Sequence, residues 1–156
     1  MKKTISYFLI VSVVLVFGLM FAQAKMMCVR TTKANVRGGP GGKYDVLWVE
    51  WQYAPFQILE QKGRWYHIMD FDGYEGYLHS SVLSDDPGVI VDVEETLVRT
   101  GPGDDYKAKW ILEHGYPLLV LERKETWLKV TDAEEVTGWI DKDNVWGLEA
   151  ASPPGY

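Results

Sequence analysis

Two stretches of this chain, RWYHIM and TWLKV, alternate between two faces with a period of two, which is the pattern of half-buried strands. In WYHIM, residues 65–69, we expect Tyr66 and Ile68 on one face of a strand and the residues between them on the other. FQILEQ and LLVLER are short runs rich in strand-forming residues, and the Asp-Gly pair at 72–73 predicts a turn between strands. No segment after residue 24 keeps a helical period, so the pattern predicts an all-β protein.

This pattern occurs twice. With a constant offset of 62 residues and no gap, residues 29–84 align with residues 91–146, and fifteen of the 56 aligned pairs are identical. An ungapped register of this length indicates an internal duplication, and two copies are too few for a solenoid. We therefore expect two similar modules, and the chain divides into residues 25–84, a linker at 85–88, residues 89–147 and an irregular tail at 148–156.

Each copy contains a Gly-Pro-Gly loop whose residue types favour a tight change of direction. Glycine reaches backbone angles that residues with a Cβ avoid, and proline holds φ near −65°. We expect the valine before the loop to be buried and the arginine to donate hydrogen bonds to loop carbonyl oxygens. If φ of Gly101 is positive, a β-branched residue there would be strained. The residues predicted to have structural roles are Val36, Arg37, Gly39, Pro40, Gly41, Val98, Arg99, Gly101, Pro102 and Gly103.

Taken in order, these motifs resemble the bacterial SH3-like domain family. The first copy reads ANVRGGPGGKYDVLW, PFQIL, GRWYHI and DGYEGYLHSSVL; the second reads LVRTGPGDDY, ETWLKV and GWIDKDNVWG, and departs from the family pattern at Leu97 and Thr126. The resemblance implies an all-β fold of two tandem small SH3-like β-barrels. It says less about function, because small barrels support many activities.

The first 24 residues have the pattern of a secretory signal peptide. Lys2 and Lys3 precede an almost wholly apolar run at residues 5–21, and residues 22–24 form an Ala-Gln-Ala cleavage site. We expect cleavage after Ala24 and an exported protein, periplasmic or extracellular. The alternative is an uncleaved anchor, because the apolar run is near the lower limit for crossing a bilayer. Contact with a membrane is expected only through that segment.

Charge is distributed unevenly between the copies. Residues 25–84 carry seven basic and six acidic side chains, whereas residues 85–156 carry seven basic and sixteen acidic ones, a net charge of −9. Nucleic acid is not an expected partner, because its recognition requires a basic surface. The acidic run is interpreted as a soluble surface.

Motifs for nucleotide, metal or nucleophilic chemistry are incomplete. GGPGGKY lacks the spacing of a phosphate-binding loop, and Asp70, Asp72 and Glu75 are too close together for a twelve-residue calcium loop. The three histidines have no partner suggested by spacing. Cys28 aligns with Ile90 and is expected to be a small buried side chain. We expect no enzyme activity, no cofactor and no metal ion.

Aromatic residues are the strongest candidates for binding. Residues 25–84 contain ten, and the second copy replaces several of them. Trp and Tyr rings bind sugars or peptides because they join an apolar face to a polar edge. Trp51 and Tyr53 are two residues apart, so an extended strand would place them on one face. The alternative is that these rings cover the contact between modules, which would stabilise two small barrels. The candidate ligand-binding residues are Trp51, Tyr53, Phe71, Tyr74, Trp65 and Tyr77.

By resemblance, the expected function is a non-catalytic binding module that recognises cell-envelope material, either a peptidoglycan peptide or glycan or an envelope protein. One alternative is a structural or assembly adaptor without cell-wall affinity. Another is an accessory to a separately encoded cell-wall hydrolase. We expect the ligand site on the first module, because the acidic second module would repel the carboxylates of peptidoglycan.

Overall fold

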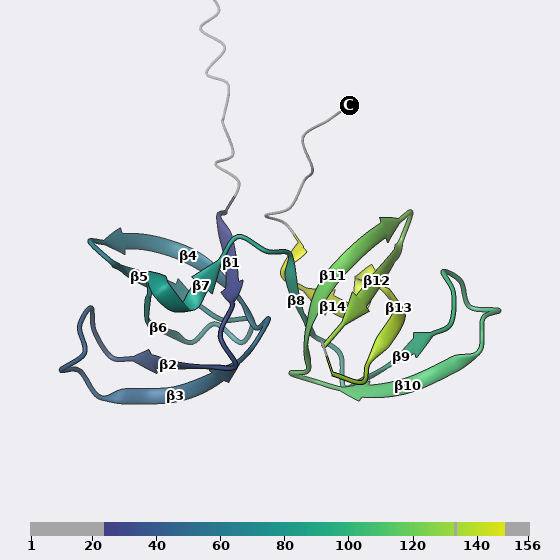
Figure 1. The fold of residues 1–156 in the computed structure, drawn as a ribbon, viewed down its shortest axis with the longest axis horizontal. Helices are drawn as coiled ribbons and strands as arrows, with labels where there is room; N and C mark the ends of the chain where they lie inside the picture. Colours follow the sequence, from purple (N-terminus) through teal and green to yellow (C-terminus); the bar gives the residue numbers. More distant parts are fainter. Residues whose placement is uncertain (1–23, 133, 149–156) are drawn as a thin grey trace, which may run out of the picture.

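The computed structural model describes residues 24–132 and 134–148, and it confirms an all-β protein built from two similar modules (Figure 1). The expected signal peptide, apart from Ala24, and the expected tail beyond Leu148 lie outside the described residues. Each module is a seven-stranded antiparallel sheet, with strand order β3-β2-β6-β5-β4-β1-β7 in the first and β10-β9-β13-β12-β11-β8-β14 in the second. The order is identical after the shift of seven strands, as the duplication predicts.

The strands follow the predicted segments closely. Module one contains β1 (Met26–Val29), β2 (Lys33–Arg37), β3 (Val46–Trp51), β4 (Pro55–Lys62), β5 (Trp65–Met69), β6 (Glu75–His79) and β7 (Leu83–Ser84). Module two contains β8 (Gly88–Val91), β9 (Glu95–Arg99), β10 (Ala108–Glu113), β11 (Pro117–Lys124), β12 (Trp127–Thr131), β13 (Thr137–Asp141) and β14 (Val145–Trp146). A short 3-10 turn precedes the last strand of each module, at Ser80–Val82 and Lys142–Asn144. Gly88 already belongs to β8, one residue earlier than the expected linker would allow.

Each module has its own apolar core, formed by the inward positions of the alternating pattern. Ile68 is fully buried and Tyr66 packs against the same core, so the predicted facing of β5 is confirmed. Val36 and Val98 are likewise fully buried at the start of their loops. Among residues 24–132 and 134–148, no helix is long and apolar enough to cross a membrane.

The Gly-Pro-Gly loops have the predicted arginine contacts. Arg37 Nη1 donates to the carbonyl oxygen of Tyr44 at 2.7 Å, and Arg99 Nη1 donates to that of Tyr106 at 2.9 Å. The reason expected for Gly101 is wrong, because its φ is not in the left-handed region. A Cβ at Gly101 would lie 2.2 Å from Cδ1 of Tyr106. The glycine is therefore required because the tyrosine ring covers the loop backbone.

The two modules pack directly against each other, with β8 in contact with β1 and β4 (Figure 1). A Cβ on Gly88 would lie 2.4 Å from the carbonyl oxygen of Tyr53 and 2.5 Å from Cβ of Cys28. The rings of Phe71 and His114 also meet across the junction, with centroids 5.1 Å apart. Cys28 is buried as expected, and this burial raises the pKa of its thiol. Close backbone contact at a glycine fixes the modules next to each other.

Candidate functional site: the junction cleft

Strands β3 and β10 lie along the same side of the molecule, and each runs toward the junction (Figure 1). Their last residues, Trp51 and Glu113, are equivalent in the repeat and line one cleft of about 430 Å³. We call this the junction cleft. Its lining consists of Thr32, Trp51 and Gln52 from module one, and Glu113, His114, Gly115, Tyr116, Pro117, Asp132 and Glu134 from module two.

Trp51 is an exposed aromatic side chain in the lining of the cleft. It ends β3, and 54% of its surface is exposed. Its cross-strand partner on β2 is Lys33, whose Nζ lies 4.3 Å from the centroid of the ring. A cation over an indole is attracted by the electron-rich face of the ring. The indole therefore has one cationic neighbour and still offers more than half of its surface to a ligand.

On the other wall, Asp132 anchors the chain through several hydrogen bonds. Its Oδ2 accepts from the Tyr116 hydroxyl at 2.7 Å, and its Oδ1 accepts from the backbone N–H groups of Glu134 and Val136 at 2.8 and 3.0 Å. Burial opposes ionisation of Asp132, but these donors outweigh it and lower the pKa of the carboxyl. Burial, followed by the bond to Asp132, raises the pKa of Tyr116 to about 12. This wall is therefore held in place by a neutral phenol and an ionised carboxylate.

Three further side chains of module two line the cleft and are open to solvent. Glu113 is the last residue of β10, and His114 begins the turn that follows. Glu134 lies in the turn whose backbone N–H groups donate to Asp132. All three side chains are exposed. Neither glutamate takes part in an ion pair within the described part of the chain. Their carboxylates can therefore meet a ligand directly.

The structure separates the two aromatic residues that were expected on one strand face. β3 ends at Trp51, and Tyr53 lies in the following turn with φ of 71°. Gly115 occupies the same turn of module two with φ of +82°. The expectation that Trp51 and Tyr53 share a strand face is therefore wrong, because a turn with a left-handed residue comes between them.

The other candidate aromatic residues lie in three different places. Phe71 contacts His114 at the junction, whereas Tyr74 is 66% exposed and does not line the cleft. Trp65 and Tyr77 form pairs with histidines on neighbouring strands. The ring of Trp65 meets His79 edge-on at 5.2 Å, and Tyr77 stacks on His67 at 4.8 Å. Of the six candidates, only Trp51 lines the junction cleft.

No local pattern in the sequence indicates that module two contributes most of the residues that line the cleft. The alignment does pair Trp51 with Glu113 and Gln52 with His114, so equivalent strand ends were already visible. That these ends meet depends on how the modules pack, which no local pattern encodes. Among residues 24–132 and 134–148, no three His, Cys, Asp or Glu side chains converge in an arrangement suited to a metal ion.

The two modules have the same strand order, the same Gly-Pro-Gly loop and a separate apolar core each, and these features define a tandem of SH3-like barrels. Comparison with known proteins agrees. The bacterial SH3 domain model matches residues 30–85 and again residues 92–147. The chain belongs to the bacterial SH3 domain family.

A relative among curated proteins is YrvJ from Bacillus subtilis (strain 168), assigned as an N-acetylmuramoyl-L-alanine amidase. It is 24% identical over 128 residues, which is 75% of this chain and 24% of the relative. The chain therefore spans about a quarter of the length of that relative.

Two solved structures are also similar. NlpC2 from Trichomonas vaginalis has a TM-score of 0.34 and 11% identity, and the match covers 80% of this chain and 48% of that one. An NlpC/P60 family protein from Bacillus cereus ATCC 10987 has a TM-score of 0.38 and 12% identity, and the match covers 78% of this chain and 56% of that one.

Proposed function

We propose that this protein is an exported, non-catalytic module that binds cell-envelope material, and that its ligand site is the junction cleft. The observation that carries the proposal is the half-exposed indole of Trp51 in a cleft of about 430 Å³ between two domains. Ligand sites are frequently found at domain interfaces, with volumes of roughly 300–1,000 Å³. An exposed indole is suited to packing on a sugar face or a peptide.

Two further observations support an envelope ligand. The relative YrvJ carries the name of an N-acetylmuramoyl-L-alanine amidase, and the part of it that aligns with this chain is about a quarter of that protein. The first 24 residues have the pattern of a signal peptide, which would place the protein outside the cytoplasm. A peptidoglycan peptide or glycan is therefore the ligand we propose.

Sedimentation with purified peptidoglycan tests the proposal. Trp51→Ala should weaken binding by about tenfold, because it removes the main aromatic surface of the cleft. Leu47→Ala is the matched control, since Leu47 is 53% exposed on the same strand but does not line the cleft. Circular dichroism of both variants would show whether each remains folded.

Two results would contradict the proposal. If the wild-type protein stays in the supernatant, the adaptor without cell-wall affinity becomes the better hypothesis. If Trp51→Ala binds as well as Leu47→Ala, the ligand site lies elsewhere. Tyr53→Ala should be measured separately from Trp51→Ala, because Tyr53 does not line the cleft and lies in a turn with φ of 71°.

A further inference from the structure

We propose that the junction cleft recognises a protonated primary amine on a peptide. This inference rests on the proposed function, because it names the chemical class of ligand for the same cleft. It differs from the expectation that the acidic second module takes no part in binding.

The charge of the cleft favours a cation. Glu113 and Glu134 are exposed carboxylates in its lining, and none of the described residues that line it is a lysine or an arginine. A neighbouring hollow shares Glu113 with the cleft and adds Glu94 and Glu95. Carboxylates grouped on one wall create a negative potential that attracts cations and repels anions. A ligand that entered with a carboxylate first would therefore meet repulsion.

The carboxylate of Asp132 is not free to bind this ligand. It already accepts hydrogen bonds from Tyr116, Glu134 and Val136, and these fix the wall. Glu113 and Glu134 are consequently the residues that would accept hydrogen bonds from an ammonium group. Each N–H of an ammonium group can be directed at a carboxylate oxygen.

The electron-rich face of the Trp51 ring is a second feature of the cleft that attracts a cation. The ring already has the ammonium group of Lys33 at 4.3 Å from its centroid, which shows that a primary amine fits against this indole. The ring remains 54% exposed. An incoming amine could therefore lie between an aromatic face and the carboxylates across the cleft, where both contributions favour a cation.

Peptides of the cell envelope carry both amines and carboxylates, and the cleft would select the amine. Two sources have the same chemistry, the α-amine at a peptide N-terminus and the side-chain amine of a diamino acid. The acidic side chains of module two would repel the carboxylates of peptidoglycan. In the cleft the same side chains would orient the ligand, because they attract its amine and repel its carboxylates.

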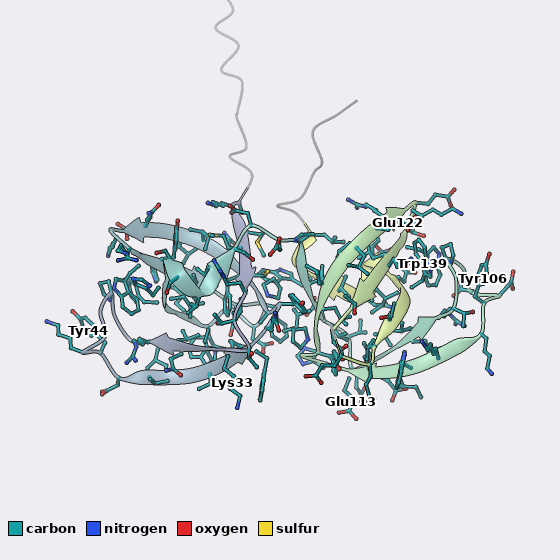
Figure 2. All side chains as sticks on the ribbon, viewed as in Figure 1. Lys33, Tyr44, Tyr106, Glu113, Glu122 and Trp139 are labelled. Atoms are coloured by element: carbon teal, nitrogen blue, oxygen red, sulfur yellow. The ribbon has the colours of Figure 1, made fainter. Side chains whose placement is uncertain are left out.

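Substitutions that change charge test the proposal by the sign of their effect. Glu113→Gln combined with Glu134→Gln should weaken binding to peptidoglycan by about three- to tenfold, since two favourable charge interactions are removed. Lys33→Gln should instead strengthen binding about twofold, because a like charge is removed from the ring. Glu122→Gln is the control: Glu122 is an exposed carboxylate on β11, on the side opposite Glu113 and Lys33 (Figure 2).

Chemical acetylation of the ligand provides the complementary experiment. Treating purified peptidoglycan with acetic anhydride converts its primary amines to neutral amides, and wild-type binding should then fall by about tenfold. Equal binding to native and acetylated peptidoglycan would overturn the amine proposal. Tighter binding by the double glutamine variant would overturn it as well, and would indicate an anionic ligand. After either result, a loss of binding by Trp51→Ala would still support the junction cleft as the site that binds envelope material.

Soluble peptides separate this proposal from the proposed function. N-acetyl-Gly-Lys-Gly amide offers only a side-chain amine, and triglycine amide offers only an α-amine. Either should shift the indole N–H resonance of Trp51, whereas the N-acetylated, ε-acetylated lysine peptide should not. If the Trp51 resonance shifts with an amine peptide but the protein does not bind peptidoglycan, the cleft recognises amines and the proposed envelope ligand is wrong. No shift with either amine peptide would overturn the inference.

Discussion

Asp70 and Asp132 occupy the same position in the two modules, yet their carboxyl groups ionise differently. Both accept hydrogen bonds from backbone N–H groups of the turn that follows. Asp132 also accepts one from Tyr116, whereas the position equivalent to Tyr116 in module one is Ala54. Burial raises the pKa of Asp70, while the additional donor helps to lower the pKa of Asp132. A phenol that only module two has, together with the lighter burial of Asp132, therefore changes the electrostatics of a shared turn while the backbone hydrogen bonds of the turn are kept.

Two tryptophans show the same kind of difference. Trp48 Nε1 donates to Glu50 Oε1 at 2.9 Å, and Leu112 stands in place of that glutamate in module two. The indole nitrogen of Trp110 is buried and has no hydrogen-bond partner among the residues that the structure describes. The backbone and core of a module can thus be retained while its half-buried polar contacts change. The duplication preserved the fold and left each module free to differ in such contacts.

The largest effect is expected where the modules are most alike, at the glycines under the loop tyrosines. Gly39→Val and Gly101→Val should each destabilise the protein by about 1–3 kcal/mol, because a side chain would displace the ring of Tyr44 or Tyr106. Gly42→Ala is the control in the same loop, since nothing lies within 4 Å of its Cβ position. Denaturant unfolding measures all three. Equal midpoints for Gly39→Val and Gly42→Ala, which change the same loop of module one, would show that the ring of Tyr44 moves aside freely.

Tyr116→Phe should make module two resemble module one at this turn. Loss of the hydrogen bond to Asp132 should cost about 1 kcal/mol and raise the pKa of Asp132. The lowered pKa of Asp132 stabilises the wild-type fold above the unfolded carboxyl pKa, and this contribution is lost as pH falls through the folded value. The raised pKa of Asp70 has the opposite sign, since its contribution is lost as pH rises through the folded value.

Carboxyl carbon NMR titrations of the wild type and Tyr116→Phe measure these two groups directly. The pKa of Asp132 should rise in the variant while that of Asp70 stays unchanged. Equal shifts at both positions would mean that the phenol acts through the whole fold rather than through its hydrogen bond.

Trp48→Phe and Trp110→Phe should differ by a smaller amount. Trp48→Phe removes the donor to Glu50 and leaves that half-buried carboxylate without it, whereas Trp110→Phe removes an N–H that has no partner. Trp48→Phe should therefore cost about 0.5–1 kcal/mol more than Trp110→Phe. The difference in free energy of unfolding from urea titrations measures it, and a larger loss for Trp110→Phe would show that its nitrogen has a water partner.

The smallest effect concerns Cys28, the counterpart of Ile90. Its thiol is buried and its pKa is raised by that burial, so the thiolate that reacts with disulfide reagents is scarce at neutral pH. Ellman's reagent should label the native protein far more slowly than the protein in denaturant. Rapid labelling of the native state would show that the β1–β8 contact opens frequently.

Much of each module could be predicted from local sequence. Alternating positions such as Tyr66 and Ile68 gave the facing of β5, and the repeated Val-Arg-x-Gly-Pro motif predicted the buried valines and the arginine contacts. These features depend on residues a few positions apart, which is the range over which periodicity and turn chemistry act. The prediction that Tyr53 shares a strand face with Trp51 was wrong because Tyr53 itself has a left-handed backbone conformation, which is usually taken by glycine.

The sequence by itself determined an all-β tandem, because strand periodicity and the duplication are both written along the chain. The site was decided only by the tertiary structure. Trp51 and Glu113 are far apart in sequence and line one cleft because the β8 backbone at Gly88 packs against Tyr53 and Cys28. That contact depends on the absence of a side chain and on the shapes of two folded surfaces. Neither has a period along the chain, so the cleft and its charge appear only once the modules are packed.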